Sequence, residues 1–280
     1  MPLLASSFQL PASFLMCRPT YYRIAYEINP WMSVQRPVDH ARALRQWNAL
    51  HHLLTKTLHV QVRLLPPQSS VPDLVFTANA GLIQGRMMIR SNFRFPQRQR
   101  EEPIIERYFR QQKFQVVTLS PRYGFEGEGD ALWVGRTLLF GFRFRSDAGV
   151  HAELARRLKR RVLPVELVDK RFYHLDTCFA PLASKTALWF PKAFDRYGRR
   201  VIEHLVPDLI AVSEADAVRF ACNTIAVDHA VVIQEGCSVG LKQQLTRRGF
   251  RLYPLDLSEF LKAGGSAKCL VLRLSQVYLT

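Results

Sequence analysis

The residues best suited to covalent chemistry lie near the C-terminus, where Cys269 follows a glycine-rich loop, 264–266, and a basic residue, Lys268. Paired glycines let a backbone approach a ligand closely, and a nearby positive charge can lower the pKa of a thiol and raise its thiolate fraction. A lone cysteine in a strand is otherwise a small core residue. Cys269 is therefore either a nucleophile or a packing residue, and three others are expected to pack: Cys178, Cys222 and Cys237.

An imidazole and a carboxylate form the second candidate group. The segment 172–182 is predicted to be a strand, in which side chains two residues apart share a face. His174 and Asp176 would then point the same way. A carboxylate beside an imidazole can hold its orientation and favours its protonated form. The alternative is a solvent-facing pair on an ordinary strand.

The most acidic part of the chain is the loop 125–130, Phe-Glu-Gly-Glu-Gly-Asp. Its three carboxylates, Glu126, Glu128 and Asp130, could bind a cation, either a metal ion or a guanidinium group. The loop has the wrong charge for a phosphate site and lacks the Gly-Lys-Ser/Thr signature of one, and its spacing is not that of an EF-hand. An exposed acidic turn is the alternative.

An asparagine amide is the fourth candidate. Asn79 follows an apolar segment, 74–77, that is predicted to be a strand. Its amide either caps a turn or contacts a ligand. Together the four candidates supply a thiolate nucleophile, an imidazole acid/base and carboxylates for a cationic substrate, which is the residue set of a covalent catalyst.

The elements that must position these residues alternate along the chain. Short apolar runs bounded by turn residues predict strands. These predicted strands cover residues 12–18, 60–65, 74–77, 81–84, 87–89, 114–119, 137–142, 162–168, 172–182, 187–190, a segment near 210, 224–227, 230–234, 250–255 and 268–274.

Helices are predicted between the strands. The first is expected to open at Pro37, with an apolar face that runs from Ala41 to Leu58 at helical spacing. A second expected cap is Asp147, at the start of a helix over 147–160. The other predicted helices are 101–112, a short one after residue 213, and 238–248. The order of two strands, a helix and a strand recurs about every 50 residues, which indicates an α/β domain with quasi-repeats.

The composition excludes several protein classes. Of the 280 residues 48% are apolar, which excludes a disordered chain. No apolar run approaches the ~18 residues of a membrane span. The five cysteines are odd in number and contain no Cys-x-x-Cys, which argues against a disulfide scaffold or a zinc finger. The first 16 residues lack the basic region of a signal peptide. We expect a cytoplasmic, enzyme-sized protein.

The net charge is +16, because 39 Lys and Arg oppose 23 Asp and Glu. Such an excess raises nucleic acid as a partner. The basic residues are scattered, however, without a basic tail, an aromatic RNA-binding motif or a Cys/His finger. We therefore expect a solvated basic surface and no nucleic-acid partner.

Six segments together resemble the guanidino-group-modifying enzymes, the amidinotransferase or pentein superfamily, which includes arginine deiminase, dimethylarginine dimethylaminohydrolase and the arginine dihydrolases. The segments are 14–32, 72–83, 125–133, 172–182, 222–233 and 257–274. The resemblance implies a five-bladed α/β propeller of ββαβ units with one active site in a central channel. It also implies that residues 1–280 form a single catalytic domain.

The resemblance assigns roles by position. Cys269 is similar to the nucleophile, His174 to the general acid/base, and Glu126 to the carboxylate that binds the guanidinium. A register shift in the loop would give that last role to Glu128 or Asp130. The other expected substrate contacts are Asn29 and Arg98 at the α-amino and carboxylate ends of the amino acid, with Asn79, Asp130, Ser266 and Asp176, the last being alternatively the partner of the histidine.

The asparagine of the segment Phe-Thr-Ala-Asn, Asn79, discriminates among the activities. Deiminases of the superfamily carry aspartate there, whereas the asparagine form is similar to arginine dihydrolases. The leading hypothesis is two hydrolytic cycles at Cys269 that convert arginine to ornithine, ammonia and carbon dioxide. The alternatives are hydrolysis of dimethylarginine to citrulline and dimethylamine, and transfer of the amidino group to another amine.

The superfamily chemistry needs neither a cofactor nor a metal. The expected partner is a small-molecule substrate, and the oligomeric state is open, a homo-oligomer included. A rival from another class is a catalytically silent basic scaffold or nucleic-acid binder. The presence of Cys269, His174 and Glu126 argues against it.

Overall fold

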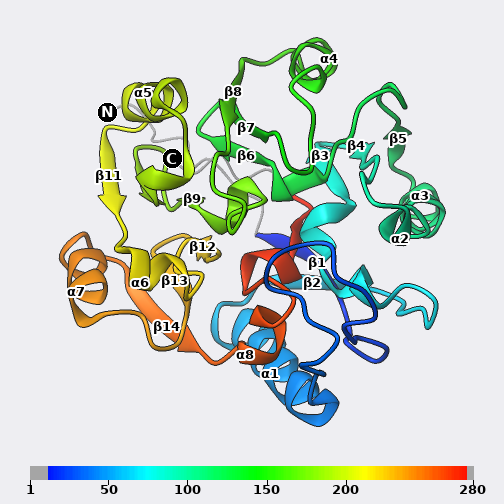
Figure 1. Cartoon of the computed structure of the whole chain (residues 1–280), viewed down its shortest axis with the longest axis horizontal. Coiled ribbons are helices and arrows are strands. Elements are labelled where there is room, and N and C mark those ends of the chain that lie inside the picture. The colour runs from blue at the N-terminus through cyan, green and yellow to red at the C-terminus, as the bar shows by residue number, and fades with distance from the viewer. Residues whose placement is uncertain (1–11, 276–280) are drawn as a thin grey trace, which may run out of the picture.

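Five small sheets form a ring in the computed structural model, which describes residues 12–275 (Figure 1). In each sheet the first two strands pair antiparallel and the third pairs parallel with the second. A parallel pair needs a crossover connection, and a helix supplies it in every sheet. The unit is therefore ββαβ, and the predicted five-bladed α/β propeller is confirmed.

Four blades are continuous in sequence. The first is β3 (Gly81–Gln84), β4 (Met87–Arg90), α2 (Pro96–Gln99), α3 (Glu102–Gln111) and β5 (Gln115–Val117). The second is β6 (Ala131–Val134), β7 (Thr137–Phe142), α4 (Val150–Leu158) and β8 (Val162–Glu166). The third is β9 (Phe179–Pro181), β10 (Thr186–Trp189), α5 (Arg196–Leu205) and β11 (Asp208–Ala211). After α6 (Glu214–Ala217), the fourth is β12 (Ile225–Val227), β13 (Ala230–Gln234), α7 (Val239–Arg247) and β14 (Arg251–Leu255).

The fifth blade joins the two ends of the described chain. After α8 (Ser258–Leu261), strand β15 (Leu272–Arg273) pairs antiparallel with β1 (Ser13–Cys17), and β1 pairs parallel with β2 (Gln61–Leu65). The crossover between β1 and β2 contains α1 (His40–His52), which continues as one π turn, Leu53–Thr57. The β1–β15 pairing closes the ring, so residues far apart in sequence meet at its centre. Cys269 and Asp176, for example, are in contact across 93 positions.

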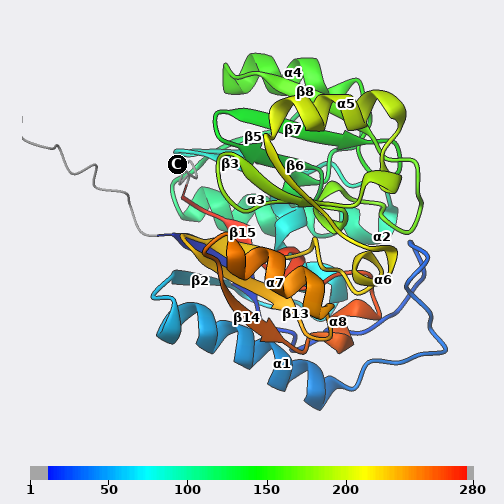
Figure 2. The ribbon, with the colours of Figure 1, turned by 90° about the vertical axis from the view of Figure 1, so that its left-hand side faces the viewer.

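Amphipathic helices cover the outside of the ring. Figure 2 shows α1 and α4 on opposite outer sides, with the strands between them. The buried face of α4 consists of Val150, Leu154 and Leu158, one residue per helical turn. In the fourth blade all five residues of the second strand, β13, are buried, whereas none of the five residues of its outer neighbour β14 is buried. The polar groups at the centre are therefore held by a rigid apolar frame.

The inner strands of four blades are preceded by 3₁₀ turns, and these turns carry the candidate residues. They are Thr77–Ala80 before β3, Gly127–Gly129 before β6, Leu175–Thr177 before β9 and Lys268–Leu270 before β15. The predicted strands over 74–77, 172–178 and 268–270 are therefore wrong. Backbone hydrogen bonds between residues three apart form these turns, such as Cys178 N to Leu175 O at 3.1 Å and Leu270 N to Ala267 O at 3.2 Å. The Thr77 hydroxyl, which lies within 2.9 Å of both Leu15 O and Leu270 O, links its turn to the fifth blade.

Two predicted helix starts are also corrected. Helix α1 begins at His40 rather than Pro37, because the Asp39 side chain accepts from Arg42 N and caps it. Helix α4 begins at Val150 without a side-chain cap, because Asp147 instead accepts from Gly124 N at 2.7 Å. The buried face of α1 includes Ala43 and Trp47, while Ala41 is exposed.

Four elements escaped sequence reasoning: the helices α2, α5 and α8 and the strand β6. Helix α5 lies where the sequence showed only a run of arginines, and β6 directly follows the acidic loop 125–130. No helix within residues 12–275 is both long enough and apolar enough to cross a bilayer. The expected absence of a signal peptide concerns residues 1–16, of which 1–11 lie outside the described residues.

Candidate active site

The thiol of Cys269 lies at the centre of the ring, on the 3₁₀ turn before β15, and the side chain is 3% exposed. Its Sγ is 3.3 Å from Asp176 Oδ2 and accepts a hydrogen bond from Asn223 Nδ2 at 3.0 Å. A Cβ atom on Gly265 would lie within 3.3 Å of this sulfur. The glycine loop thus leaves space beside the thiol, as the sequence suggested.

The imidazole of His174 is paired with a carboxylate from another blade. His174 Nε2 lies 2.8 Å from Glu126 Oε2, and the two side chains are 1% and 0% exposed. Asp176 is not the partner of this histidine, because the chain turns at Leu175–Thr177 and directs Asp176 toward Cys269 instead. That alternative for Asp176 is therefore corrected.

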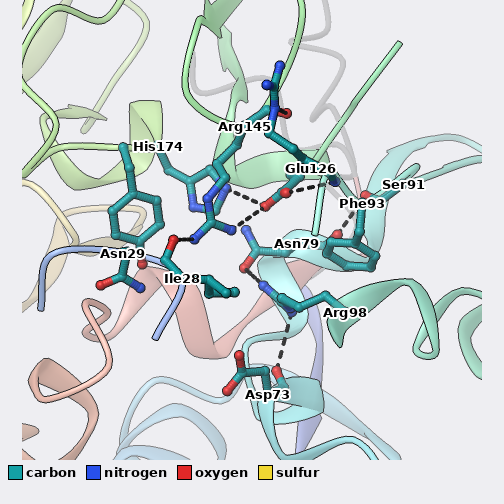
Figure 3. Close-up of polar contacts among 12 residues, drawn as sticks. Ile28, Asn29, Asp73, Asn79, Ser91, Phe93, Arg98, Glu126, Arg145 and His174 are labelled. Carbon is teal, nitrogen blue, oxygen red and sulfur yellow. Dashed lines mark hydrogen bonds and ion pairs between the residues drawn. The ribbon is translucent and has the colours of Figure 1, made fainter. Parts of the chain in front are cut away.

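A buried arginine completes this pair. Arg145 Nη1 donates to the same Glu126 Oε2 at 3.0 Å, and Nη2 donates to Ile28 O at 2.9 Å (Figure 3). The Arg145 guanidinium also lies between the rings of Phe95 and Tyr173, at 4.7 Å and 4.6 Å from their centroids. Contacts with Glu126, Ile28 and the two aromatic rings thus fix the position of the Arg145 guanidinium.

A second buried arginine, Arg98, is held by Glu101 in a bidentate pair, Nε to Oε1 at 2.7 Å and Nη2 to Oε2 at 2.8 Å. Its Nη1 donates to Asn79 Oδ1 at 2.8 Å, and Nη2 also reaches Asp73 O at 3.3 Å. Because Asn79 Oδ1 accepts from Arg98, the amide orientation is set, and Asn79 Nδ2 faces the opposite way (Figure 3). A Cβ on Gly129 would collide with that Nδ2 atom.

These groups surround a small cavity. Its lining includes Asp73, Asn79, Arg98, Arg145 and Cys269 among its polar residues, with Asn29, Ile28, Met32, Phe76, Tyr173 and Ala263. Two buried polar atoms of the lining have no hydrogen-bond partner among the described residues, Asp73 Oδ1 and Asn79 Nδ2. The same is true of His174 Nδ1 and of Asp176 Oδ1, whose residue contacts the lining residue Cys269. Buried polar groups are normally satisfied, so this cluster is built to receive a polar molecule.

The protonation states follow from burial and neighbouring charges. Burial, and then the charge of Asp176, raises the pKa of the Cys269 thiol well above its usual value. Burial raises the pKa of Asp176 to about 6, against the lowering effect of Lys268. Burial also lowers the pKa of His174 to about 4, despite Glu126, so the imidazole is neutral at pH 7. The Arg145 and His174 neighbours hold the pKa of Glu126 well below its usual value.

Two expected contacts are not brought to the cavity. Asp130 accepts from Ser146 Oγ at 2.6 Å and from Leu175 N at 3.1 Å, so both its oxygens fix the turn that follows His174. Ser266 Oγ donates to Gln234 Oε1 at 3.1 Å, away from the thiol. The side chains of Asp130 and Ser266 therefore make internal contacts in this structure, and their expected role as substrate contacts stays a prediction.

The three carboxylates of the acidic loop, Glu126, Glu128 and Asp130, occupy different surroundings. Glu128 accepts from Lys268 Nζ at 2.9 Å and lines a different, mostly apolar cavity. Of the loop carboxylates, Glu126 contacts the histidine, and its oxygens are occupied by His174, Arg145 and Arg94 N. Glu126 is therefore placed to orient the imidazole rather than to meet a guanidinium directly.

The expected residue Asn29 lines the cavity but uses its own amide locally. Asn29 Oδ1 accepts from Trp31 N at 2.9 Å, and Nδ2 donates to Ala263 O at 3.1 Å. Its side chain joins the N-terminal loop to the glycine loop. Asn29 therefore shapes the cavity wall.

Sequence reasoning missed Asp73, Arg145 and Asn223. Asp73 and Asn223 lie in two of the segments that carried the family resemblance, 72–83 and 222–233, but neither residue was given a role. Nothing local marks Arg145, which is one of 39 basic residues and meets Ile28 across 117 positions. Within residues 12–275 no group of His, Cys, Asp and Glu has the arrangement of a metal site, and all five cysteines there are free thiols.

Known proteins resemble this chain over most of its length. A family model described as "N,N dimethylarginine dimethylhydrolase, eukaryotic" matches residues 27–276. The chain is 47% identical over 268 residues to the bifunctional arginine dihydrolase/ornithine cyclodeaminase AgrE of Nostoc, covering 94% of this chain and 38% of that protein. The chain thus spans about two fifths of the length of that relative.

A shorter relative and a solved structure match over most of their own lengths. The N(G),N(G)-dimethylarginine dimethylaminohydrolase of Mycobacterium tuberculosis is 40% identical, over 93% of this chain and 85% of that protein. The product-bound N-terminal domain of ArgZ, an arginine dihydrolase from cyanobacteria, superposes with a TM-score of 0.92 at 42% identity. It covers 97% of this chain and 100% of that domain.

Proposed function

Because this chain belongs to the N,N-dimethylarginine dimethylaminohydrolase family, we propose that it hydrolyses the guanidino group of free L-arginine through a covalent intermediate on Cys269. Two hydrolytic rounds would yield ornithine, two molecules of ammonia and carbon dioxide. The likeness to AgrE and to the ArgZ domain supports arginine as the substrate. The proposal concerns the dihydrolase activity alone, since the chain spans 38% of AgrE.

The observation that carries the proposal is the free carboxylate oxygen beside the thiol. Asp176 Oδ2 is 3.3 Å from Cys269 Sγ, and Asp176 Oδ1 has no partner among the described residues. A guanidinium that pairs with Asp176 would bring its central carbon next to the sulfur. The positive charge of the substrate would also offset Asp176, which otherwise raises the thiol pKa.

The other end of an amino acid suits the opposite side of the cavity. Arg98 and Arg145 are two fixed cations for a carboxylate, and the unpartnered Asp73 Oδ1 is an acceptor for an ammonium group. A zwitterionic amino acid is thus matched at both charges. Burial of these groups favours exclusion of water around the bound molecule.

The proposed chemistry assigns proton transfers to His174. Its Nε2–H donates to Glu126, which leaves the unpartnered Nδ1 as the base. In the first cycle the Cys269 proton passes to His174, and the resulting thiolate attacks the guanidino carbon. Ammonia leaves with that proton from the imidazolium, and the neutral His174 then deprotonates the water that releases citrulline and the Cys269 sulfur. A second attack on the ureido carbon expels the second ammonia, and hydrolysis then gives a carbamate that decomposes to ornithine and carbon dioxide.

The second candidate function is hydrolysis of dimethylarginine to citrulline and dimethylamine. It is favoured by the M. tuberculosis relative, most of whose length the chain covers. Both reactions use the same first half. They differ in the leaving amine and in whether the ureido product is processed further.

The test offers arginine, dimethylarginine and citrulline separately to the purified protein and identifies the products. Ornithine from arginine supports the proposal, and citrulline without ornithine contradicts it. Dimethylamine from dimethylarginine, at a higher kcat/KM than arginine consumption, would favour the second candidate. Consumption that survives Cys269→Ala would exclude covalent catalysis at this residue.

A further inference from the structure

The fourth blade also contributes a polar side chain to the centre of the ring. The turn before β12 contains Asn223, which is 0% exposed and lies in a position equivalent to the turns that carry Asn79, Asp176 and Cys269. The turn is shaped by Phe220, whose φ of 61° is unusual for a residue other than glycine. Such strained backbone is retained where the surrounding structure demands it.

Both the oxygen and the nitrogen of the Asn223 amide have hydrogen-bond partners around Cys269. Its Oδ1 accepts from Ser266 N at 2.8 Å and from Cys269 N at 3.1 Å. Its Nδ2 donates to Asp176 O and to Cys269 Sγ, both at 3.0 Å. Two backbone donors fix the oxygen, so the amino group must face the sulfur.

We propose that Asn223 is a further catalytic residue, whose Nδ2–H group donates to Cys269 Sγ and stabilises the thiolate that attacks the substrate. The sulfur lies between this donor and the carboxylate of Asp176, which destabilises a negative charge on sulfur. Hydrogen bonds to charged groups are stronger than those between neutral groups. Asn223 therefore offsets part of the effect of burial and of Asp176.

The role rests on the proposed function in one respect, that Cys269 is the nucleophile. It is nevertheless measurable without any substrate, because alkylation by iodoacetamide requires the thiolate. Trypsin cleaves after Lys268 and Arg273, so the reacted cysteine is read from the peptide 269–273 by mass spectrometry. The other four cysteines lie in other peptides.

The test compares the wild-type chain with two variants. Asn223→Asp is isosteric but places a negative oxygen against the sulfur, and Asn223→Ser removes the Nδ2–H donor and leaves only a shorter hydroxyl side chain. Thr224→Val is the matched control, because Thr224 is the adjacent buried residue and its hydroxyl donates to Val232 O, not to the thiol. Thermal unfolding and circular dichroism establish that each variant is folded. Asn223→Ser decides the question if the aspartate variant does not fold.

We expect the pH midpoint of Cys269 alkylation to rise by about one unit or more in the folded Asn223 variants, and the rate at neutral pH to fall about tenfold. Thr224→Val should keep the wild-type midpoint. A folded Asn223 variant with an unchanged midpoint overturns the proposal. A shifted midpoint in a protein that releases no product from arginine would support this role and contradict the proposed function, so the two failures are distinguishable.

Discussion

His174 Nε2 and Glu126 Oε2 lie 2.8 Å apart in the interior, and Arg145 donates to the same carboxylate oxygen. This arrangement gives the imidazole one defined tautomer, with Nδ1 free as a base. It also directs the Glu126 carboxylate away from a direct role in guanidinium binding. In the proposed mechanism Asp176 takes that role.

Glu126→Gln should lower kcat by about 10²-fold or more, because the neutral amide cannot stabilise the imidazolium that forms during proton transfer. The variant should also lose about 3 kcal/mol in the free energy of unfolding, since the buried Arg145 loses its carboxylate. Steady-state kinetics and urea denaturation measure the two effects. A variant with wild-type kcat would show that Glu126 serves stability alone.

Asp176→Asn should change two observables in opposite directions. The charge of Asp176 raises the pKa of Cys269, so its removal should speed iodoacetamide alkylation at neutral pH. The same change should lower kcat/KM for arginine by about 10²-fold or more, because the guanidinium loses its counter-ion. Slower alkylation, or unchanged kcat/KM, would contradict the placement of the guanidinium beside Asp176.

The wild-type pH profile should have an acid limb set by Asp176. Burial raises the pKa of Asp176 to about 6 in the empty site, so the carboxyl group is neutral below that pH and charged above it. Guanidinium binding needs the charged form, so kcat/KM should fall as pH drops through about 6 and should rise above it. His174, with a pKa of about 4, titrates too low to produce this limb. A flat profile between pH 5 and pH 7 would argue against the assignment.

How far the sequence predicted this molecule depends on the range of the interactions involved. Strands β3 and β13 were predicted with their observed bounds, because short apolar runs between turn residues are a local signal. The turns that carry Asp176 and Cys269 were predicted as strands, because an apolar run does not reveal a 3₁₀ turn. Their geometry depends on hydroxyl and backbone contacts made between blades.

For the candidate site too, local features could be predicted from the sequence and long-range contacts could not. The residue types of Cys269 and His174 suggested their chemistry without structural information. The pairing of His174 with Glu126, rather than with its close neighbour Asp176, arises only when two blades meet across 48 positions. Arg145 and Asn223 were missed because their contacts span 117 and 46 positions, and the resemblance of the segment 222–233 alone does not reveal what Asn223 contacts.

The buried pair of Arg98 and Glu101 should govern substrate affinity. Glu101→Gln removes one charge from a bidentate pair that aims Arg98 at Asn79 and the cavity. We expect KM for arginine to rise about tenfold while kcat changes less, because Arg98 would contact the amino acid end and not the reacting carbon. Cys237→Ala, at a buried position that does not line the cavity, is the control and should keep both parameters. Equal loss of kcat and kcat/KM in Glu101→Gln would place its effect on the chemical step instead.

The net charge of +16 should give no advantage in capturing the substrate. Arginine is itself a cation, so the long-range field of the protein repels it. In the proposed mode binding depends on two short-range carboxylates, Asp73 in the cavity lining and Asp176 beside Cys269. Salt screens the long-range field within a Debye length of about 10 Å at 0.1 M. We therefore expect kcat/KM for arginine to stay constant or to rise modestly as ionic strength increases from about 0.05 M to about 0.3 M.

Potassium chloride and sodium chloride series should agree, which excludes a specific ion effect. A steep fall in kcat/KM as salt increases would show that the field of the protein attracts arginine, and it would contradict this prediction.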